Sequence, residues 1–149
     1  MDIQGIATAF RSAFESVQLN DAPGFIPHFP EGCCNWAAWM LGHYLKFELS
    51  LDPNEIQGER FDDKGHCVHA WLTVSGLTVD ITADEFQDGP ADVVATASSP
   101  WHAGWKVIRV EDILPISSHD SSSYSGYAQP SEIYERLAAH MRLTGRGDR

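Results

Sequence analysis

Apolar positions at the start of the chain recur with helical spacing. The apolar stripe of this first segment consists of Ile3, Ile6, Ala7, Phe10, Phe14 and Val17. Residues three and four apart share one face of a helix, so the pattern predicts an amphipathic helix that ends near the sequence NDAPG. The two prolines of FIPHFPEG, at residues 25–32, exclude regular structure from the segment that follows.

A second helix is predicted from about Cys34 to Glu48, where the sequence has no proline and one glycine. Its apolar residues fall on more than one face. One face carries Cys34, Ala38, Leu41 and Leu45, and another carries Trp36, Met40 and Phe47. A helix that is apolar on several faces is typical of the centre of a domain, so we expect it to be mostly buried.

Further along, the apolar period changes to two. Residues 51–65 are polar and turn-rich and are predicted to form a loop. CVHAWLTV (67–74) and LTVDIT (77–82) alternate and are separated by Ser75-Gly76, which predicts a two-residue β-hairpin. After a looser stretch at 88–104, WKVIRV (105–110) predicts a third strand, and residues 117–130 a surface loop.

The C-terminal part of the chain predicts a last helix, capped by Ser131 and with Glu132 in its first turn. Its inward-facing residues are expected to be Ile133, Leu137, Ala138 and Met141. The order helix, helix, strands, helix contains no internal repeat and no linker. It predicts a single α+β domain over residues 1–149, long enough to bury a core without disulfides or metals.

The register of the predicted hairpin brings two polar side chains, His69 and Asp80, together. With Ser75 and Gly76 as turn residues, the numbers of paired residues sum to 151, so Trp71 faces Asp80. His69 and Asp80 then become diagonal neighbours on one face, within reach of a hydrogen bond, whereas a shift of one residue would separate them. The opposite face is entirely apolar: Val68, Ala70, Leu72, Val74, Leu77, Val79 and Ile81.

Two adjacent cysteines precede the second helix. At its first turn, unpaired backbone N–H groups and the helix dipole favour an anion, so Cys34 is a candidate thiolate nucleophile at neutral pH. Such a thiolate needs a histidine to shuttle protons and a third group to orient that histidine, and His69 and Asp80 fill these roles. Cys33 is the alternative nucleophile and otherwise fills space. Cys67 is predicted to belong to the core.

These segments, in this order, resemble the transglutaminase-like branch of the papain-like cysteine-enzyme superfamily. GCC (32–34) is similar to its G-x-C motif, with Cys34 as nucleophile; HAWL (69–72) is similar to its H-x-W strand, and VDIT (79–82) to its V-D-x-T strand. The resemblance covers roughly residues 29–86. The chain departs from the pattern in the short spacing of eleven residues between His69 and Asp80. An aromatic residue often follows the nucleophile, where this chain has Asn35.

The resemblance implies a papain-like or transglutaminase-like core, in which a central helix carrying the cysteine packs on a small antiparallel sheet. It implies a cysteine hydrolase or acyltransferase acting on a protein, peptide or small amide or thioester substrate. Cys34 would attack the carbonyl, His69 would protonate the leaving group, and Asp80 would orient His69. The thioacyl-enzyme would then pass to water or to an amine.

The oxyanion hole is not assigned by these motifs. The backbone N–H of Cys34 and the side chains of His28 and Asn35 are candidates. Trp71, between His69 and Asp80 on the same face, is placed to shield the pair from water.

Two other classes of function compete with an enzyme. One is a non-catalytic binding module on the same fold, and the other is a structural zinc domain. Soft zinc ligands are available at Cys33, Cys34, His66, Cys67 and His69. The chain has no C-x-x-C pair, however, and His66 and His69 on a strand would splay apart, so the sequence predicts no metal and no cofactor.

The remaining reactive side chains are expected to be structural. The histidines in this group are His43, His66, His102, His119 and His140, and Trp101 and Trp105 are expected to pack beside a strand. Asp84 and Glu85 follow the aspartate strand and are expected to be solvated rather than to bind a cationic substrate group.

The composition restricts the classes of binding partner and the cellular compartment that we expect for this protein. The formal charge of −11 argues against nucleic acids and anionic membranes, which both need a basic surface. Three cysteines, two of them adjacent, do not form a disulfide framework, which favours a reducing compartment. With no signal peptide and no apolar run of about 20 residues, a cytoplasmic location is expected, although export by a signal-less route would leave no trace. The oligomeric state stays open.

Overall fold

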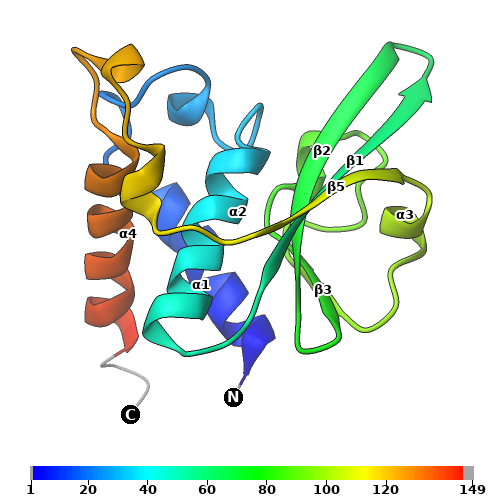
Figure 1. The fold of residues 1–149 in the computed structure, drawn as a ribbon, viewed down its shortest axis with the longest axis horizontal. Helices are drawn as coiled ribbons and strands as arrows, with labels where there is room; N and C mark the ends of the chain where they lie inside the picture. The colour runs from blue at the N-terminus through cyan, green and yellow to red at the C-terminus, as the bar shows by residue number, and fades with distance from the viewer. Residues whose placement is uncertain (1, 146–149) are drawn as a thin grey trace.

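A group of helices packs against one side of an antiparallel sheet, and the computed structural model describes this arrangement for residues 2–145 (Figure 1). The helices on this side are α1 (Ile3–Ser16), α2 (Cys34–His43) and α4 (Pro130–Gly145), and a short helix, α3 (Pro100–Ala103), lies at the far side of the sheet. The helix predicted to run to Glu48 changes to π-helical geometry over its last turn, η2 (Tyr44–Glu48). The α+β class is therefore as predicted.

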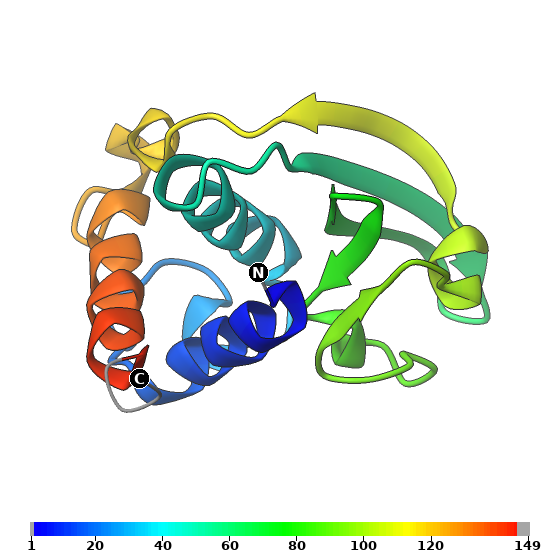
Figure 2. The same ribbon diagram turned by 90° about the horizontal axis from the view of Figure 1, so that it is seen from below.

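The sheet has strand order β4-β3-β2-β1-β5 and every neighbouring pair is antiparallel. Its strands are β1 (Asn54–Asp62), β2 (Gly65–Val74), β3 (Leu77–Asp80), β4 (Val94–Thr96) and β5 (Lys106–Asp112). Figure 2 shows the β1 and β5 side of the sheet curving away from the helices toward α3. Among residues 2–145, no helix combines the length and apolar character required to cross a membrane.

The predicted hairpin is confirmed in its register. Leu72 pairs with Val79 and Val74 with Leu77, so the paired numbers sum to 151. Both turn residues, Ser75 and Gly76, have positive φ angles (52° and 77°), as a type I′ turn requires. β3 ends at Asp80, which leaves the neighbouring part of β2 open to other elements.

Residues 51–65 are not a loop, and this prediction was wrong. They contain β1, which lies between β2 and β5 and pairs with both. The strand is hidden in the sequence because it is polar and even buries Glu55. The predicted third strand exists as β5, but it pairs with β1 rather than with the hairpin, and the looser stretch before it contains β4 and α3.

Gly58 of β1 pairs with His69 of β2 at a register shift in the β1–β5 ladder. A Cβ atom at Gly58 would lie 2.7 Å from Trp71 Cη2 and 2.9 Å from Trp105 Cβ. We expect Gly58→Ala to lower the free energy of unfolding by about 1–3 kcal/mol, because the two indole rings have to move. Urea unfolding measures the change. Gly104→Ala is the matched control, since its Cβ would make only ordinary contacts, and an equal loss there would contradict the packing argument.

The main core lies between the helices and the apolar face of the hairpin. The second helix is mostly buried, as predicted, although Phe47 near its end is 45% exposed. On the hairpin, Leu72 and Val79 are buried, but Val68 is 47% exposed because it lies beyond the part of β2 that helices cover. A smaller cluster on the opposite face contains Ile56, Trp71 and Trp105.

The last helix begins at Pro130 rather than after a Ser131 cap, so this prediction was wrong. Proline suits the first helical position because no intrahelical partner awaits its missing N–H. The Glu132 carboxylate accepts a hydrogen bond from the Gln129 N–H (3.0 Å), which closes the helix start. Ser131 instead bonds to Asp120, in a segment predicted as loop that contains η4 (Ile116–His119) and η5 (Ser122–Tyr124). The four residues predicted to face inward are buried.

Candidate active site

Cys34 is the first residue of α2 and its side chain is partly exposed. No side chain caps this helix, so its first-turn N–H groups remain free to stabilise an anion. Gly32 allows the sharp entry into the helix, because its φ of 65° favours glycine and a Cβ there would lie 2.9 Å from the Phe25 ring. The local chain thus presents the Cys34 sulfur at a helix N-terminus.

Cys33 is not available as the alternative nucleophile. Its side chain is fully buried, and its S–H donates to the backbone carbonyls of Glu31 (3.0 Å) and Phe25 (3.4 Å). Burial raises the pKa of the Cys33 thiol to about 12, with a smaller contribution from nearby negative charge. Cys33 therefore fills space in the core and stays a thiol at neutral pH.

His69 and Asp80 are held together as the hairpin register predicts. His69 Nε2 lies 2.7 Å from Asp80 Oδ2, and both residues are buried. The backbone N–H of Thr82 donates to the other carboxylate oxygen at 2.9 Å. Asp80 is thus fixed from two sides, and it holds the His69 ring by one nitrogen.

The surroundings of His69 and Asp80 favour the charged form of both side chains. Burial alone would lower the pKa of the His69 imidazole, but its interactions with Asp80 and Cys34 raise it to about 10. Burial likewise opposes ionisation of Asp80, yet hydrogen bonds from His102 and His69 hold its pKa well below the ordinary value. At neutral pH the pair is therefore an imidazolium and a carboxylate.

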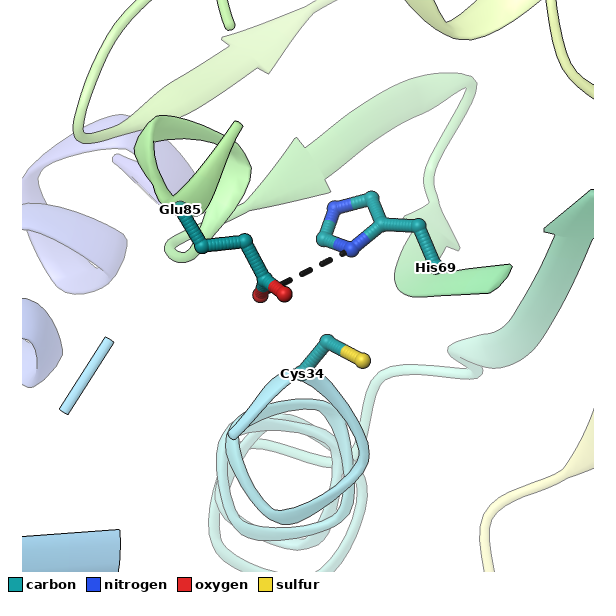
Figure 3. Close-up of side chains that lie close together, drawn as sticks. All are labelled: Cys34, His69 and Glu85. Carbon is teal, nitrogen blue, oxygen red and sulfur yellow. Dashed lines mark ion pairs between the residues drawn. The ribbon is translucent and has the colours of Figure 1, made fainter. Parts of the chain in front are cut away.

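The other nitrogen of His69 faces Cys34. Because Nε2 is engaged by Asp80, Nδ1 is the atom on the side of the helix N-terminus, as Figure 3 shows. The Cys34 sulfur, a ring nitrogen of His69 and a carboxylate oxygen of Glu85 all lie within 4.8 Å of one another. Cys34, His69 and Asp80 are thereby brought to one place.

Glu85 belongs to this site and was expected to be solvated, so that prediction was wrong. It lies in η3 (Ala83–Glu85), directly after the aspartate strand, and its Oε2 is 3.9 Å from His69 Nδ1. Its side chain is only 13% exposed. Burial raises the pKa of Glu85 to about 7, with the charge of Asp80 adding to the effect and His69 opposing it.

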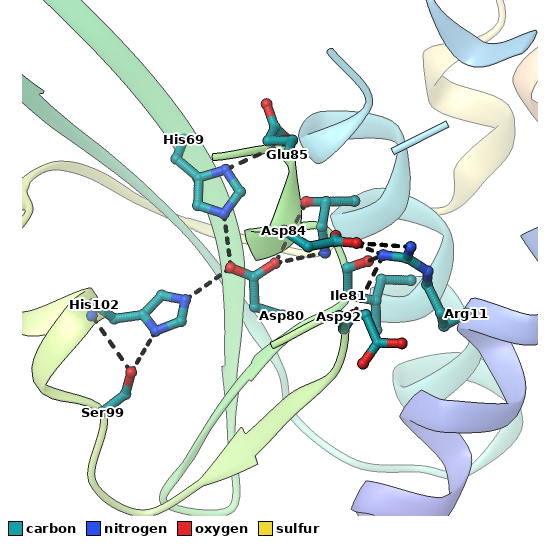
Figure 4. A network of polar contacts seen from close by, with 10 residues as sticks. Arg11, His69, Asp80, Ile81, Asp84, Glu85, Asp92, Ser99 and His102 are labelled. Carbon is teal, nitrogen blue, oxygen red and sulfur yellow. Dashed lines mark hydrogen bonds and ion pairs between the residues drawn. The ribbon is translucent and has the colours of Figure 1, made fainter. Parts of the chain in front are cut away.

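The neighbouring Asp84 is exposed to solvent, as expected, but it also has a structural role. It forms a two-pronged ion pair with Arg11 of α1 (2.7 and 2.9 Å), and Arg11 also donates to the carbonyl of Ile81 (Figure 4). Arg11 is buried. This clamp ties the segment after β3 to α1 and so fixes the position of Glu85.

His102 of α3 is a second partner of Asp80 that sequence reasoning assigned no role. Its Nε2 lies 2.7 Å from the same Asp80 oxygen that binds His69, as Figure 4 shows. Since a carboxylate only accepts, both histidines donate to it. Ser99 holds the other nitrogen of His102. His102 therefore positions Asp80 and stabilises its charge.

Aromatic rings enclose His69. The ring centroids of four side chains lie 5.0–5.8 Å from that of His69: Phe86, Trp71, Trp101 and Trp105. Trp71, which was expected to shield the pair, is itself buried and lies beside the His69 ring. Trp101 and Trp105 pack beside the strands, as expected, but they do so against the histidine itself. An apolar enclosure strengthens the electrostatic interactions within it.

The other predicted site residues lie elsewhere. His28, in η1 (Ile26–His28), and Asn35, the second residue of α2, are both exposed. Within residues 2–145, no hydrogen bond links either side chain to Cys34, His69 or Asp80. No contact therefore supports a part for His28 or Asn35 in an oxyanion hole. The backbone N–H of Cys34 lies at the helix N-terminus and remains a candidate donor.

Of the five side chains weighed as zinc ligands in the sequence, Cys34 and His69 come together, but Cys33, His66 and Cys67 do not join them. Cys33 is sequestered in the core, and His66 bonds to Glu59 on the exposed part of the β1–β2 hairpin (2.8 Å). Cys67 is only half-buried and its S–H donates to Asp62 (3.4 Å), so its prediction as a core residue was also wrong. It lies outside the core because the tip of the hairpin extends past the helices.

A cleft of about 590 Å³ lies beside the site. It is formed by the tip of the β1–β2 hairpin and the segment after η3, and Glu85 and Phe86 line it. Its wall also carries the carboxylates of Asp62, Asp63 and Asp88 and the cationic side chains of Arg60 and Lys64. Glu85 thus belongs both to the cleft and to the cluster around Cys34.

Comparison of the chain with protein-family models, with curated proteins and with solved structures finds no significant match.

Proposed function

We propose that this protein is a cysteine-dependent hydrolase or acyltransferase that forms a thioacyl-enzyme on Cys34. The observation that carries the proposal is the buried His69–Asp80 pair, whose remaining ring nitrogen faces a cysteine at a helix N-terminus. A thiolate, an imidazolium and an orienting carboxylate in this order are the parts that nucleophilic acyl transfer requires.

The chemistry follows from the positions of the groups. In the resting site the proton of Cys34 is held on His69 Nδ1 as part of the imidazolium, and the thiolate sulfur attacks the carbonyl carbon of an amide, peptide or thioester. Negative charge then develops on the carbonyl oxygen, where the first-turn N–H groups of α2, including that of Cys34, are the donors at hand. His69 gives its proton to the leaving group, and a thioester on Cys34 remains for water or an amine to cleave.

Asp80 and His102 act on this reaction through His69. Asp80 fixes the ring so that Nδ1 faces the sulfur, and it stabilises the imidazolium that forms. His102 holds Asp80 in turn. They are positioning residues, because neither is placed to touch the carbonyl.

The fold supports a papain-like or transglutaminase-like core as part of this proposal. The cysteine helix packs on an antiparallel sheet whose adjacent strands carry the histidine and the aspartate. The order along the chain is that of the family which the motifs resemble. Protein, peptide or small amide substrates are the corresponding partners.

Direct detection of an acyl group on Cys34 tests the proposal. We expect brief incubation with p-nitrophenyl acetate, an activated ester, to add one acetyl group to Cys34, detected by intact mass and peptide mapping. The adduct should vanish in Cys34→Ala, form far more slowly in His69→Ala, and be released by hydroxylamine as a thioester is. Cys67→Ser is the matched control and should behave like the natural protein. Acetylation at Cys67, or none at Cys34, would overturn the proposal.

A further inference from the structure

The cluster in front of His69 has the composition of a metal site. It joins a thiol from α2, an imidazole from β2 and a carboxylate from η3, which Figure 3 draws together. All three ligand atoms lie within 4.8 Å of one another, and His69 Nδ1 is 3.9 Å from Glu85 Oε2. Tetrahedral Zn²⁺ places neighbouring S, N and O ligands roughly 3.3–3.8 Å apart. The separations here are longer, so the Cys34 and Glu85 side chains would rotate toward the ion on binding.

Two atoms of this cluster are buried without a hydrogen bond, although they form a long ion pair with each other (3.9 Å). Among the described residues, His69 Nδ1 and Glu85 Oε2 have no hydrogen-bond partner and are shielded from solvent. Leaving such atoms unpaired is costly, so a pair of them aimed at one point indicates a missing ligand. A cation with an affinity for nitrogen, oxygen and sulfur satisfies both.

The groups that would orient these metal ligands are already in place. Metal-bound histidines usually donate their other N–H to a carboxylate, which fixes the ring and raises its basicity. Asp80 does this for His69 at 2.7 Å, and Thr82 and His102 hold Asp80. The Arg11 clamp on Asp84 fixes the turn that carries Glu85.

A second trio with ligand spacing does not compete. His69, Asp80 and His102 also lie within 4.8 Å of one another, but both histidines use Nε2 to bind one oxygen of Asp80. Their facing atoms are already paired and buried, so a cation would have to break two good hydrogen bonds. Cation binding at Cys34, His69 and Glu85 breaks no hydrogen bond of this kind.

The cleft adjoins the cluster, because Glu85 belongs to both. The cleft wall carries more negative than positive side chains, Asp62, Asp63, Glu85 and Asp88 against Arg60 and Lys64, and the chain as a whole carries a formal charge of −11. Negative potential along a cleft concentrates cations there.

From these observations we propose that Cys34, His69 and Glu85 form a binding site for Zn²⁺ or a similar soft divalent cation, which blocks the nucleophile reversibly. Binding replaces the one proton that Cys34 and His69 share: the thiolate sulfur bonds to the metal, and His69 Nδ1 gives up its proton. This proton goes to solvent, so affinity falls as the pH falls. The metal binding stands by itself, whereas its inhibitory effect rests on the proposed acyl-transfer function.

Titration of the reduced full-length protein with Zn²⁺, and with Co²⁺ as a spectroscopic probe, tests the site. We expect one Zn²⁺ by calorimetry and a thiolate-to-cobalt absorption band in the near ultraviolet. Cys34→Ser should abolish the band, and Glu85→Gln, which keeps the side-chain shape, should weaken Zn²⁺ binding by at least about 10-fold. Zn²⁺ should protect Cys34 from iodoacetamide, and a chelator should reverse the protection.

Two control variants separate this site from weaker surface ligands. Cys67→Ser removes the thiol beside Asp62, and His66→Ala removes the exposed histidine beside Glu59; both should leave the titration unchanged. Zn²⁺ binding that survives Cys34→Ser but is lost in either control would overturn the inference. An activated Cys34 that binds no Zn²⁺ refutes the metal site alone, and Zn²⁺ bound at an unreactive Cys34 refutes the acyl-transfer function alone.

Discussion

Replacing His69 with alanine is expected to slow the alkylation of Cys34 by iodoacetamide about 100-fold at pH 6. The ring nitrogen that faces the sulfur is the group that takes its proton, and the imidazolium then stabilises the thiolate. Without the ring, only the helix N-terminus favours the thiolate. The measurement is the rate of label incorporation at Cys34, followed by peptide mapping.

His66→Ala is the control for this effect. His66 lies three residues away on the same strand, is exposed, and bonds to Glu59 rather than to the site. Its loss should leave the rate at Cys34 within about twofold, since a distant exposed charge is screened. An equal loss of reactivity in both variants, or none in His69→Ala with its fold intact, would show that His69 does not activate Cys34.

Asp80→Asn is expected to lower the free energy of unfolding by about 3–5 kcal/mol at pH 6, the typical cost of removing one partner from a buried ion pair. The Asp80 carboxylate accepts hydrogen bonds from two histidines and a backbone N–H, and the neutral amide cannot satisfy all three as an acceptor. Urea unfolding measures the loss. Asp88→Asn, which breaks the exposed ion pair with Arg60, should cost no more than about 1 kcal/mol.

The same pair sets how stability depends on pH. The pKa of Asp80 is lowered on folding, so its contribution is present above about pH 4 and is lost as the pH falls below that value. The pKa of His69 is raised to about 10, so its contribution is complete below about pH 6.5 and declines as the pH rises toward 10. Stability should therefore be greatest between about pH 4 and 6.5, and Asp80→Asn should flatten the profile. A natural protein that gains stability from pH 6.5 to 9 would contradict this.

The His69–Asp80 pair was accessible from the sequence because a two-residue turn fixes the register of a hairpin. Once Ser75 and Gly76 are placed in the turn, counting puts both side chains on one face, and the hydrogen bond between them follows. The choice of Cys34 over Cys33 needed the start of the helix to within one residue. Sequence patterns locate such boundaries poorly, which is why both cysteines stayed open.

Strand β1 could not be predicted because its stability comes from its neighbours. It is paired on both sides, and this allows a polar sequence with a buried Glu55 to form a strand. Tertiary pairing of this kind overrides local propensity. Val68 was misplaced for a related reason, since the extent of the helical cover depends on the packing of the whole domain.

Glu85 and His102 reach the site through short irregular turns. Glu85 lies in η3, whose position depends on the distant Arg11, and His102 lies in a four-residue helix after an aperiodic stretch. Neither segment has a period that assigns a face to its side chains. The one local signal was that Glu85 follows the aspartate strand by only a few residues.

The most direct measurement is competitive labelling of the three cysteines of the reduced natural protein with limiting iodoacetamide at pH 6. The account predicts that Cys34 is labelled first and by a wide margin, because only this sulfur combines a helix N-terminus with an adjacent imidazolium. Cys67, which is half-exposed, should follow slowly, and Cys33 should react only after unfolding. Labelling of Cys67 ahead of Cys34, or equally slow labelling of both, would contradict the presence of an activated nucleophile.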